Sequence, residues 1–260
     1  MSRKNQPMTM AEIRKMEVVC RLAAEMLQYS EKLVKPGVST LEINDAIHER
    51  TLSLGCESAP LNYHGFPKSV CTSVNDVICH GVPAADEILM PGDIINIDVT
   101  LKKDGFFGDT SATFFVGEVS EKAKKVTAAA KAGMLAGIEQ VKAGNRTEDI
   151  GFATHKIVTK QGFHTVKSIG GHGIGDEFHQ EPQILHYGKP GTGLELKEGM
   201  TFTIEPMVNA GRYQTKIKRD GWTVETKDGR LSSQWEHTML VTADGVEVFT
   251  ARTDEPFSAG

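Results

Sequence analysis

The sequence has no long hydrophobic run, no excess of basic residues and few cysteines. No apolar stretch approaches the roughly 18 residues that suggest a membrane span, and the first ten residues do not resemble a signal peptide. The net charge of -5 argues against nucleic acid or an anionic membrane as the main partner. The four cysteines form no Cys-x-x-Cys pair, which argues against a zinc finger and a disulfide framework. We therefore expect a cytoplasmic protein with reduced thiols.

What the sequence does contain is an internal repeat. The segments ending at Asp98 and Glu205 both read Leu-x-x-Gly-x-x-x-x-Ile-acid, and they are offset by 107 residues. At the same offset, residues 34–55 and 141–162 share eight identities in 22 aligned positions. We predict one domain over residues 1–260, in which two pseudo-symmetric halves, about 8–116 and 119–250, share one continuous sheet.

The second pair of acids does not keep this offset. Asp109 and Glu236 each open a similar strand-like segment, but they are 127 residues apart, so the second half carries about 20 extra residues. The extra segment includes Tyr213 and Trp222. The sequence leaves two interpretations open, a pocket wall and a surface hairpin.

Hydrophobic periodicity and capping residues predict the same order of elements in both halves. Residues 8–34 have helical spacing, with Thr9 as the N-cap and Glu12 three residues later. A second helix is expected to open at residue 39 or 40 and to end at Gly55. The remaining expected elements are strands at 69–75, 94–102 and 111–115 with a hairpin turn at 103–105, helices at 120–141 and 147–161, and strands at 166–169, 201–210 and 237–242. This order predicts an α+β fold, with helices outside a curved antiparallel sheet.

Five side chains on these segments form a set of hard donors: Asp98, Asp109, His172, Glu205 and Glu236. Acids at strand ends are usually solvated or paired with a base, but here the repeat places two of them at equivalent positions. Four carboxylates and one imidazole suit a pair of divalent cations such as Mn, Fe, Co or Zn. The set therefore predicts a two-metal hydrolytic site.

The histidines differ in how strongly their surroundings indicate a function. His172 lies among four glycines, which allow the close backbone approach that an ion-binding loop needs. His80 and His179 lie in short turns beside Gly or Pro, and their assignment depends on the metal site. The helical pair His48 and His155 repeats at the common offset, which suggests packing. His164 and His186 are expected to be structural or exposed. Cys71 and Cys79 could line a pocket near His80.

Taken together, these segments resemble the type I methionine aminopeptidases, which have the pita-bread fold. The resemblance covers nearly the whole chain and rests on Tyr63-His-Gly-Phe-Pro-Lys-Ser-Val-Cys71, Asn75 to His80-Gly, Asn96-Ile-Asp98, Gly108-Asp109-Thr-Ser, Gly170-Gly-His172-Gly-Ile-Gly, Phe178-His179, Thr203-Ile-Glu205-Pro and Gln234-Trp-Glu236-His. The chain has neither an N-terminal zinc-binding extension nor the helical insertion of type II enzymes, so it is similar to the short bacterial form.

The resemblance implies a role for each of these residues. Asp109 and Glu236 would bridge two ions (Co, Mn, Fe(II), Zn or Ni), Asp98 would serve one ion, and His172 with Glu205 the other. Glu205 would accept a proton, His179 would stabilise the oxyanion, and His80 would contact the scissile amide or shuttle its proton. The substrate methionine would contact Tyr63, Phe66, Cys71, His80, Phe178, His179 and Trp222. A monovalent cation would bind at Asn75, Val77 and Ser232.

The implied substrates are the N-termini of nascent polypeptides whose second residue is small. A monomer is expected, with contact to the ribosome as a further possibility. Pro60 and Phe66 depart from the commonest bacterial pattern, which has Cys and Tyr there, and this puts the fine tuning of substrate preference in doubt. Three alternatives remain: an Xaa-Pro peptidase on the same fold, a non-catalytic binding protein, and a metal-dependent phosphatase. The last would require an electropositive pocket that the sequence does not show.

Overall fold

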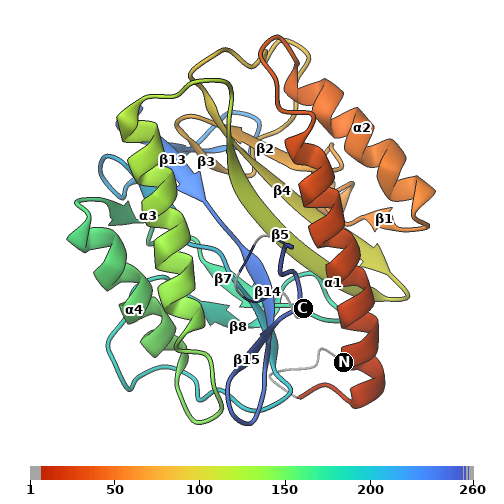
Figure 1. Cartoon of the computed structure of the whole chain (residues 1–260), viewed down its shortest axis with the longest axis vertical. Coiled ribbons are helices and arrows are strands. Elements are labelled where there is room, and N and C mark those ends of the chain that lie inside the picture. The colour runs from red at the N-terminus through yellow and green to blue at the C-terminus, as the bar shows by residue number, and fades with distance from the viewer. Residues whose placement is uncertain (1–6, 254, 256, 258–260) are drawn as a thin grey trace.

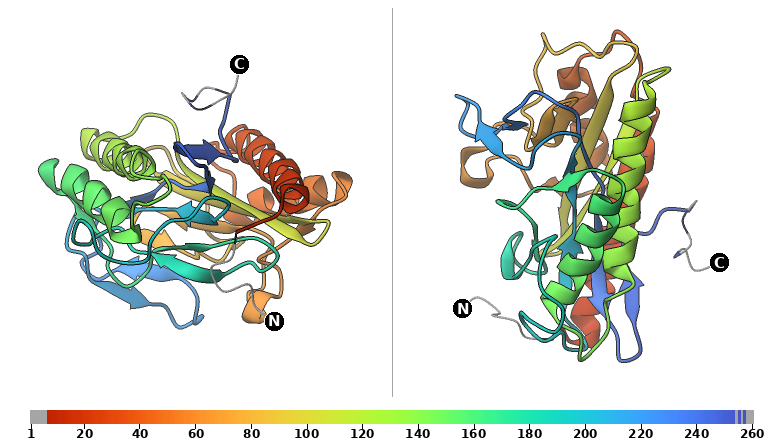
Figure 2. Two further views of the ribbon diagram at one scale, coloured as in Figure 1. Left: turned by 90° about the horizontal axis from the view of Figure 1, so that it is seen from below. Right: turned by 90° about the vertical axis from the view of Figure 1, so that its left-hand side faces the viewer.

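Two pairs of helices flank the strands of the computed structural model, which describes residues 7–253, 255 and 257. The first pair is α1 (Met10–Glu31) with α2 (Thr40–Ser53), and the second is α3 (Glu121–Ile138) with α4 (Thr147–Lys160) (Figure 1). In Figure 2, α1 and α3 lie on one side of the strands and the segment around residues 215–226 lies on the other. Among the described residues, no helix combines the length and hydropathy needed to cross a membrane.

The helix starts follow from the capping residues. Thr9 caps α1, and the Glu12 side chain accepts a hydrogen bond from the Thr9 backbone N–H at 2.7 Å. Ser39 and Glu42 form the equivalent capping box at α2. Each box satisfies backbone N–H groups that have no partner in the first turn. The predicted helices are therefore confirmed, with ends that differ by a few residues.

The strands are short except for the long β4–β5 hairpin. They are β1 (Glu57–Ser58), β2 (Cys71–Val74), β3 (Val77–Cys79), β4 (Ile94–Lys103), β5 (Phe106–Phe115), β6 (His164–Thr165), β7 (Gly171–Gly173), β8 (Gln180–Ile184), β9 (Thr201–Ile204), β10 (Met207–Asn209), β11 (Thr215–Ile217), β12 (Val224–Thr226), β13 (Ser232–Gln234), β14 (His237–Val241) and β15 (Val246–Val248). Asp104 and Gly105 form the predicted turn, both with positive φ.

The pairing is antiparallel throughout, as predicted, but the expected continuous sheet is divided into four hydrogen-bonded groups. Their orders are β1-β4-β2 with β5 on β4, β13-β10-β6, β11-β12-β3 and β15-β14-β9-β7-β8. The expected strand 201–210 is interrupted at Pro206, which has no N–H to donate. The expected strand 166–169 is absent, because this segment leads into a pocket wall instead.

One seam between the two halves lies where β5 faces β14. Among the described residues, an isolated backbone bridge from Ser111 to Glu236 joins the halves at this seam. Side chains supplement it: Asn96 Nδ2 and Thr113 Oγ1 both donate to the carbonyl of Gln234, at 2.9 and 2.8 Å. The candidate acids of both halves therefore lie along one line of contact.

Helix α1 packs directly against β5 beside this seam. Met16, Val19 and Cys20 are fully buried there. A Cβ atom on Gly108 would lie 2.8 Å from the Cα atom of Cys20, so only glycine permits this approach. Each large apolar side chain buried in this way contributes roughly 1.5–3 kcal/mol. This packing thus fixes the position of β5 at Gly108, one residue before Asp109.

Candidate metal centre and pocket

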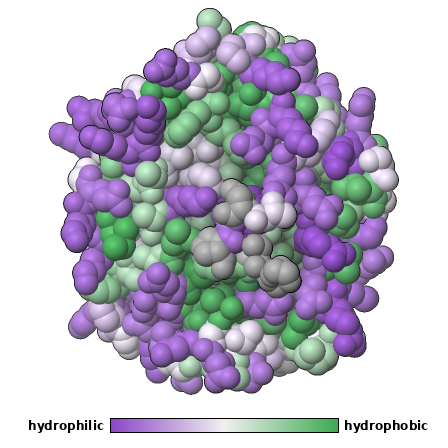
Figure 3. Space-filling model, in the orientation of Figure 1, coloured by the Kyte–Doolittle hydropathy of each residue, from purple (hydrophilic) through white to green (hydrophobic). Residues whose placement is uncertain are grey.

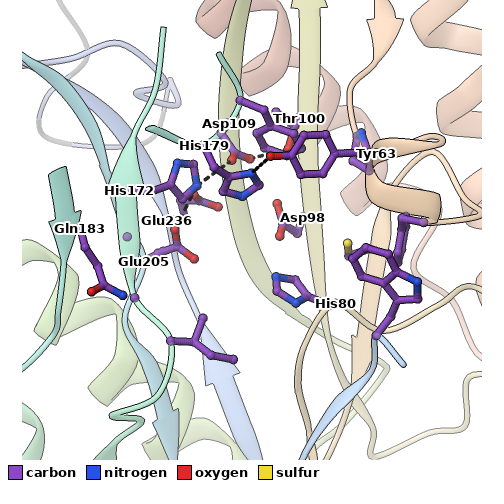
Figure 4. A pocket seen from close by; sticks show the side chains of 18 of the residues that line it. Tyr63, His80, Asp98, Thr100, Asp109, His172, His179, Gln183, Glu205 and Glu236 are labelled. Atoms are coloured by element: carbon purple, nitrogen blue, oxygen red, sulfur yellow. Dashed lines mark hydrogen bonds and ion pairs between the residues drawn. The ribbon is translucent and has the colours of Figure 1, made fainter. Parts of the chain in front are cut away.

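A cavity of about 320 Å³ is lined in part by Trp222. This residue belongs to the segment that lies on the side of the strands away from α1 and α3 (Figure 2). All twelve residues predicted to bind metal, to bind substrate or to act in catalysis line it: Tyr63, Phe66, Cys71, His80, Asp98, Asp109, His172, Phe178, His179, Glu205, Trp222 and Glu236. Figure 4 shows the four carboxylates around a common space, with His80, His172 and His179 beside it. The fold therefore brings together residues that are up to 173 positions apart.

The first half contributes Asp98 and Asp109 through the register of the β4–β5 hairpin. Asp98 pairs with Ser111 and Thr100 pairs with Asp109. The hydroxyl of Thr100 donates to Asp109 Oδ1 at 2.7 Å. Ser111 is also the residue that bridges to Glu236. Three of the acids are thus positioned by one hairpin and its contact across the seam.

The second half contributes His172 and Glu205 through β7 and the end of β9. Thr203 Oγ1 accepts from the His172 backbone N–H at 3.1 Å and donates to Glu205 Oε1 at 2.8 Å. His172 Nδ1 bonds the carbonyl of Gly173 at 3.0 Å, and since a carbonyl can only accept, Nδ1 carries a hydrogen. Nε2 faces the acids, 3.6 Å from Asp109 and 3.5 Å from Glu205. Neutral His172 would therefore present a lone pair to this space.

In the metal-free site, burial and mutual repulsion raise the pKa of three of the acids. Burial is the largest cause for Asp98, Glu205 and Glu236, and the charge of Asp109 adds to it in all three. The pKa of Glu205 is raised to about 7. Burial alone would lower the pKa of His172, but Asp109 and Glu205 together raise it. The metal-free site therefore keeps protons on some of these carboxyls, because its own side chains cannot neutralise four negative charges.

Divalent cations fit this arrangement. Asp98 Oδ1 is buried without a hydrogen-bond partner among the described residues, and a buried acceptor in that state is costly unless a ligand satisfies it. One donor atom from each of Asp109, His172 and Glu236 lies within 4.8 Å of the other two. Carboxylate oxygens with one imidazole nitrogen are suitable donors for Mn, Fe, Co or Zn. The geometry thus supports divalent metal binding.

Two further histidines lie beside the acids. His179 Nδ1 is 2.9 Å from the hydroxyl of Tyr63, which opens the 3-10 turn η1 (Tyr63–Gly65) (Figure 4). Partial burial and the neighbouring imidazoles lower the pKa of His179. Burial and His172 likewise lower the pKa of His80, whose backbone φ is 55°. Both side chains are therefore neutral at physiological pH.

Aromatic rings form the apolar wall of the cavity. The rings of Phe66 and Trp222 meet edge to face, with centroids 5.4 Å apart. The centroids of Tyr63 and Phe178 are 4.8 Å apart. Cys71 adds a buried sulfur that burial keeps protonated, since it raises the pKa of the thiol well above its usual value. These surfaces would suit a flexible apolar side chain.

Both interpretations of the inserted segment, a pocket wall and a surface hairpin, are correct in part. It forms the β11–β12 hairpin, which pairs with β3 of the first half. Trp222 lies on the connection between its strands and lines the cavity, whereas Tyr213 is 40% exposed and lies outside it. Cys79 is also not a lining residue, because it is buried in a separate apolar cluster.

Sequence reasoning missed several residues that hold the acids. They are Thr100, Thr203, Gln234 and His186. Gln234 Nε2 donates to Glu205 Oε2 at 3.1 Å, and His186 Nε2 accepts from the Glu205 backbone N–H at 3.0 Å. Thr100, Thr203 and Gln234 each lie two positions from an acid, on the same face of the chain, so strand periodicity was an available signal. No local pattern marks His186, which we expected to be structural or exposed, or Gln183, which lines the cavity.

The predicted monovalent-cation residues lie outside this cavity. The Asn75 carbonyl accepts a hydrogen bond from the Ser232 backbone N–H at 2.8 Å, and Val77 belongs to β3. Asn75 has a backbone φ of 53°, and its side chain donates to Asp93 at 2.8 Å. These contacts bring Asn75 and Ser232 together, and cation binding there stays a prediction.

Known proteins share both the sequence and the fold of this chain. The pattern of metallopeptidase family M24 matches residues 14–243. Methionine aminopeptidase A of Synechocystis is 51% identical over 239 residues, which are 92% of this chain and 94% of that protein. The crystal structure of methionine aminopeptidase from Rickettsia prowazekii has a TM-score of 0.93 at 48% identity, covering 95% of this chain and 99% of that one.

A more distant structure shares the fold alone. The Xaa-Pro dipeptidase from Bacillus anthracis has a TM-score of 0.78 at 22% identity, and this chain spans only 63% of its length. The α+β pita-bread fold is thus common to both groups, whereas close sequence similarity connects this chain to the first. The chain belongs to metallopeptidase family M24 and, within it, to the methionine aminopeptidases.

Proposed function

We propose that this protein removes the N-terminal methionine from polypeptides as a two-metal aminopeptidase. The observation that carries the proposal is the buried group of four carboxylates and one imidazole at an aromatic-lined cavity. The non-catalytic alternative is disfavoured because none of the five predicted ligands has been replaced. The phosphatase alternative is disfavoured because no Lys or Arg side chain lines the cavity in the described part of the chain.

In this proposal Asp109 and Glu236 would both hold two ions, Asp98 would serve one of them, and His172 with Glu205 would serve the other. Bridging carboxylates place negative charge where two nearby cations repel each other most. When bound, the ions would polarise the scissile carbonyl, hold the substrate's free α-amino group and lower the pKa of a water molecule. Anchoring of the α-amino group favours cleavage of the first peptide bond.

The remaining chemistry belongs to side chains of the cavity. Glu205 accepts the proton of the attacking water, for which a pKa near neutrality in the metal-free site is suitable. A bound cation would lower that pKa, so the carboxylate form prevails in the loaded enzyme. His80 contacts the scissile amide and can pass a proton to the leaving nitrogen.

His179 stabilises the oxyanion, and Tyr63 selects the imidazole tautomer that can do so. The Tyr63 hydroxyl stays protonated, because burial and the charge of Glu177 raise its pKa. A hydroxyl that donates to Nδ1 leaves the hydrogen on Nε2. Nε2 can then donate to the developing negative charge on the substrate.

We expect Tyr63→Phe to lower kcat about tenfold with little change in KM. The variant keeps the aromatic ring but removes the hydroxyl, so the imidazole loses its tautomer bias. This loss of kcat should be smaller than the roughly 10²–10³-fold loss caused by removing an oxyanion donor outright. The variant His179→Ala, which removes the donor, is the reference. Steady-state rates on a methionyl peptide measure both constants, and an unchanged kcat would exclude this role for Tyr63.

Methionine selectivity is assigned to Tyr63, Phe66, Cys71, Phe178 and Trp222. A thioether sulfur near aromatic rings gains on the order of 0.3–1.5 kcal/mol for each contact. Several such contacts would favour methionine over a branched side chain of similar volume. Pro60 also lines the cavity, so the two departures from the common pattern both lie where they could change preference.

A set of short peptides tests the proposal directly. With Mn, Co or Fe(II) supplied, the protein is expected to release Met from Met-Ala-Ser and much less from Met-Leu-Ser, because a small second residue is required. Leu-Ala-Ser is the matched control for the first residue, and Ala-Pro-Ser tests the Xaa-Pro alternative. Faster cleavage of Ala-Pro-Ser than of Met-Ala-Ser would overturn the proposal in favour of that alternative.

We infer a single catalytic domain acting as a monomer on nascent chains in the cytoplasm, with the ribosome as a candidate partner. Co, Mn, Fe(II), Zn and Ni are all compatible with the donor set. A monovalent cation at Asn75, Val77 and Ser232 would stabilise the turn between β2 and β3, which precedes His80 in the chain.

A further inference from the structure

Three side chains that follow β15 form a buried polar network behind the metal site. We call Thr250, Arg252 and Glu255 the C-terminal bracket. All three are buried, with exposed fractions of 0%, 6% and 4%. The bracket follows β15, which lies on the same side of the strands as α1 and α3 (Figure 1). Figure 3 shows this face, where apolar side chains gather between hydrophilic helix surfaces.

Glu255 contacts nitrogen atoms of side chains from three segments. Arg252 Nη2 donates to Glu255 Oε1 at 2.6 Å, and His237 Nε2 lies 3.1 Å from Oε2. Lys131 of α3 approaches Oε1 at 3.5 Å. Burial alone would raise the pKa of Glu255, but His237 and Arg252 hold it well below its usual range. Glu255 is therefore a buried anion that keeps Arg252 and His237 in place.

The bracket reaches the backbone of Glu236 through Thr110. Arg252 Nη1 donates to Thr110 Oγ1 at 3.3 Å, and Thr110 Oγ1 donates to the Glu236 carbonyl at 2.8 Å. Thr110 follows Asp109 on β5, so its side chain points away from the cavity. One hydroxyl thus ties the strand of Asp109 to the backbone of Glu236.

The bracket reaches the backbone of Asp109 through Thr238. Thr250 Oγ1 accepts from the Thr238 backbone N–H at 3.0 Å. Thr238 Oγ1 donates to the Asp109 carbonyl at 2.7 Å and accepts from the Asp109 N–H at 3.3 Å. The hydroxyls of Thr110 and Thr238 therefore link the two strands in both directions. Thr110 bonds the bracket through its hydroxyl, and Thr238 bonds it through its backbone N–H.

These links matter because the seam has little backbone pairing of its own. In the part of the chain described, Ser111 to Glu236 is the only backbone bridge across this seam. We infer that the C-terminal bracket is a positioning device that sets the spacing of Asp109 and Glu236 across this seam. The inference rests on the proposed function, in which these two carboxylates bridge the ions. A shift of either strand would move a ligand shared by both ions.

Matched variants of the full-length protein test this role through metal binding. Thr110→Val removes the hydroxyl at nearly constant volume, Thr110→Ser keeps it, and Glu255→Gln removes the buried charge. Val158→Ala, in the core between α3 and α4, is a control that lowers stability away from the network. For each protein, the readouts are the Co(II) dissociation constant, the visible absorption spectrum of the Co(II) form and the melting temperature of the metal-free form.

Thr110→Val and Glu255→Gln are expected to raise the Co(II) dissociation constant at least about tenfold, within the range for residues that orient ligands, and to change the spectrum. Thr110→Ser should stay close to wild type, and Val158→Ala should lower the melting temperature alone. If the first two variants melt earlier yet keep the wild-type constant and spectrum, the bracket only stabilises the fold and the inference is overturned. If the wild-type protein binds no Co(II) pair, the proposed function itself fails.

Discussion

Asp109→Asn is expected to lower kcat/KM for Met-Ala-Ser by more than about 100-fold. This loss exceeds the largest effect that is typical of residues that only orient metal ligands. The amide keeps the size of the side chain and can still accept from Thr100, but it removes the charge and one bridging oxygen. Two cations then repel each other without compensation between them. Initial rates and metal content of the reconstituted variant measure the effect.

Asp244→Asn is the matched control for this substitution. Asp244 is exposed, lies in the turn before β15 and does not line the cavity. The same chemical change there should leave both rate and metal content close to wild type. Asp109→Asn retaining more than a tenth of wild-type activity would contradict the bridging role.

The metal-free protein is expected to lose stability as the pH rises above about 7. Asp98 and Glu236 have pKa values well above their ordinary 3.8 and 4.5, with burial as the largest cause. In the unfolded chain these groups are already ionised at pH 7, so the folded state holds more protons. Each such proton lowers the free energy of unfolding by about 1.4 kcal/mol per pH unit until the folded group ionises.

Between about pH 7 and 8.5, the other titrating groups do not reverse this fall in the free energy of unfolding. Histidines whose pKa is lowered, such as His186, are neutral in both states there. His172, whose pKa is raised, changes stability in the same direction as the carboxyls. The free energy of unfolding of the metal-free protein, measured with urea at about pH 7 and at pH 8.5, tests this prediction. Asp98→Asn should reduce the slope, and Mn(II) should abolish it, since metal binding displaces protons. A metal-free protein that is more stable at pH 8.5 would disprove the account of the acids.

The local elements were predictable because their signals are local. Capping boxes mark the starts of α1 and α2, and the Asp104-Gly105 turn fixes the β4–β5 register that pairs Thr100 with Asp109. The repeat predicted that Asp98 and Glu205 occupy equivalent positions. Strand periodicity, applied fully, would also have found Thr100, Thr203 and Gln234 beside their acids.

Contacts between distant segments could not be predicted in this way. His186 supports Glu205 from a loop, and Gln183 enters the cavity wall from β8, without any pattern that marks either. The division into four groups of strands follows from Pro206 and from the inserted hairpin, whose pairing with β3 is long-range. The C-terminal bracket is similarly invisible in sequence, because Arg252 and Glu255 read as ordinary polar residues near a chain end.

The most direct test of the central claim is an anomalous difference map from crystals of the protein grown with Mn(II). The account predicts two peaks about 3.5–4 Å apart, both contacted by Asp109 and Glu236, with Asp98 on one and with His172 and Glu205 on the other. A single peak, or peaks away from these five side chains, would contradict it.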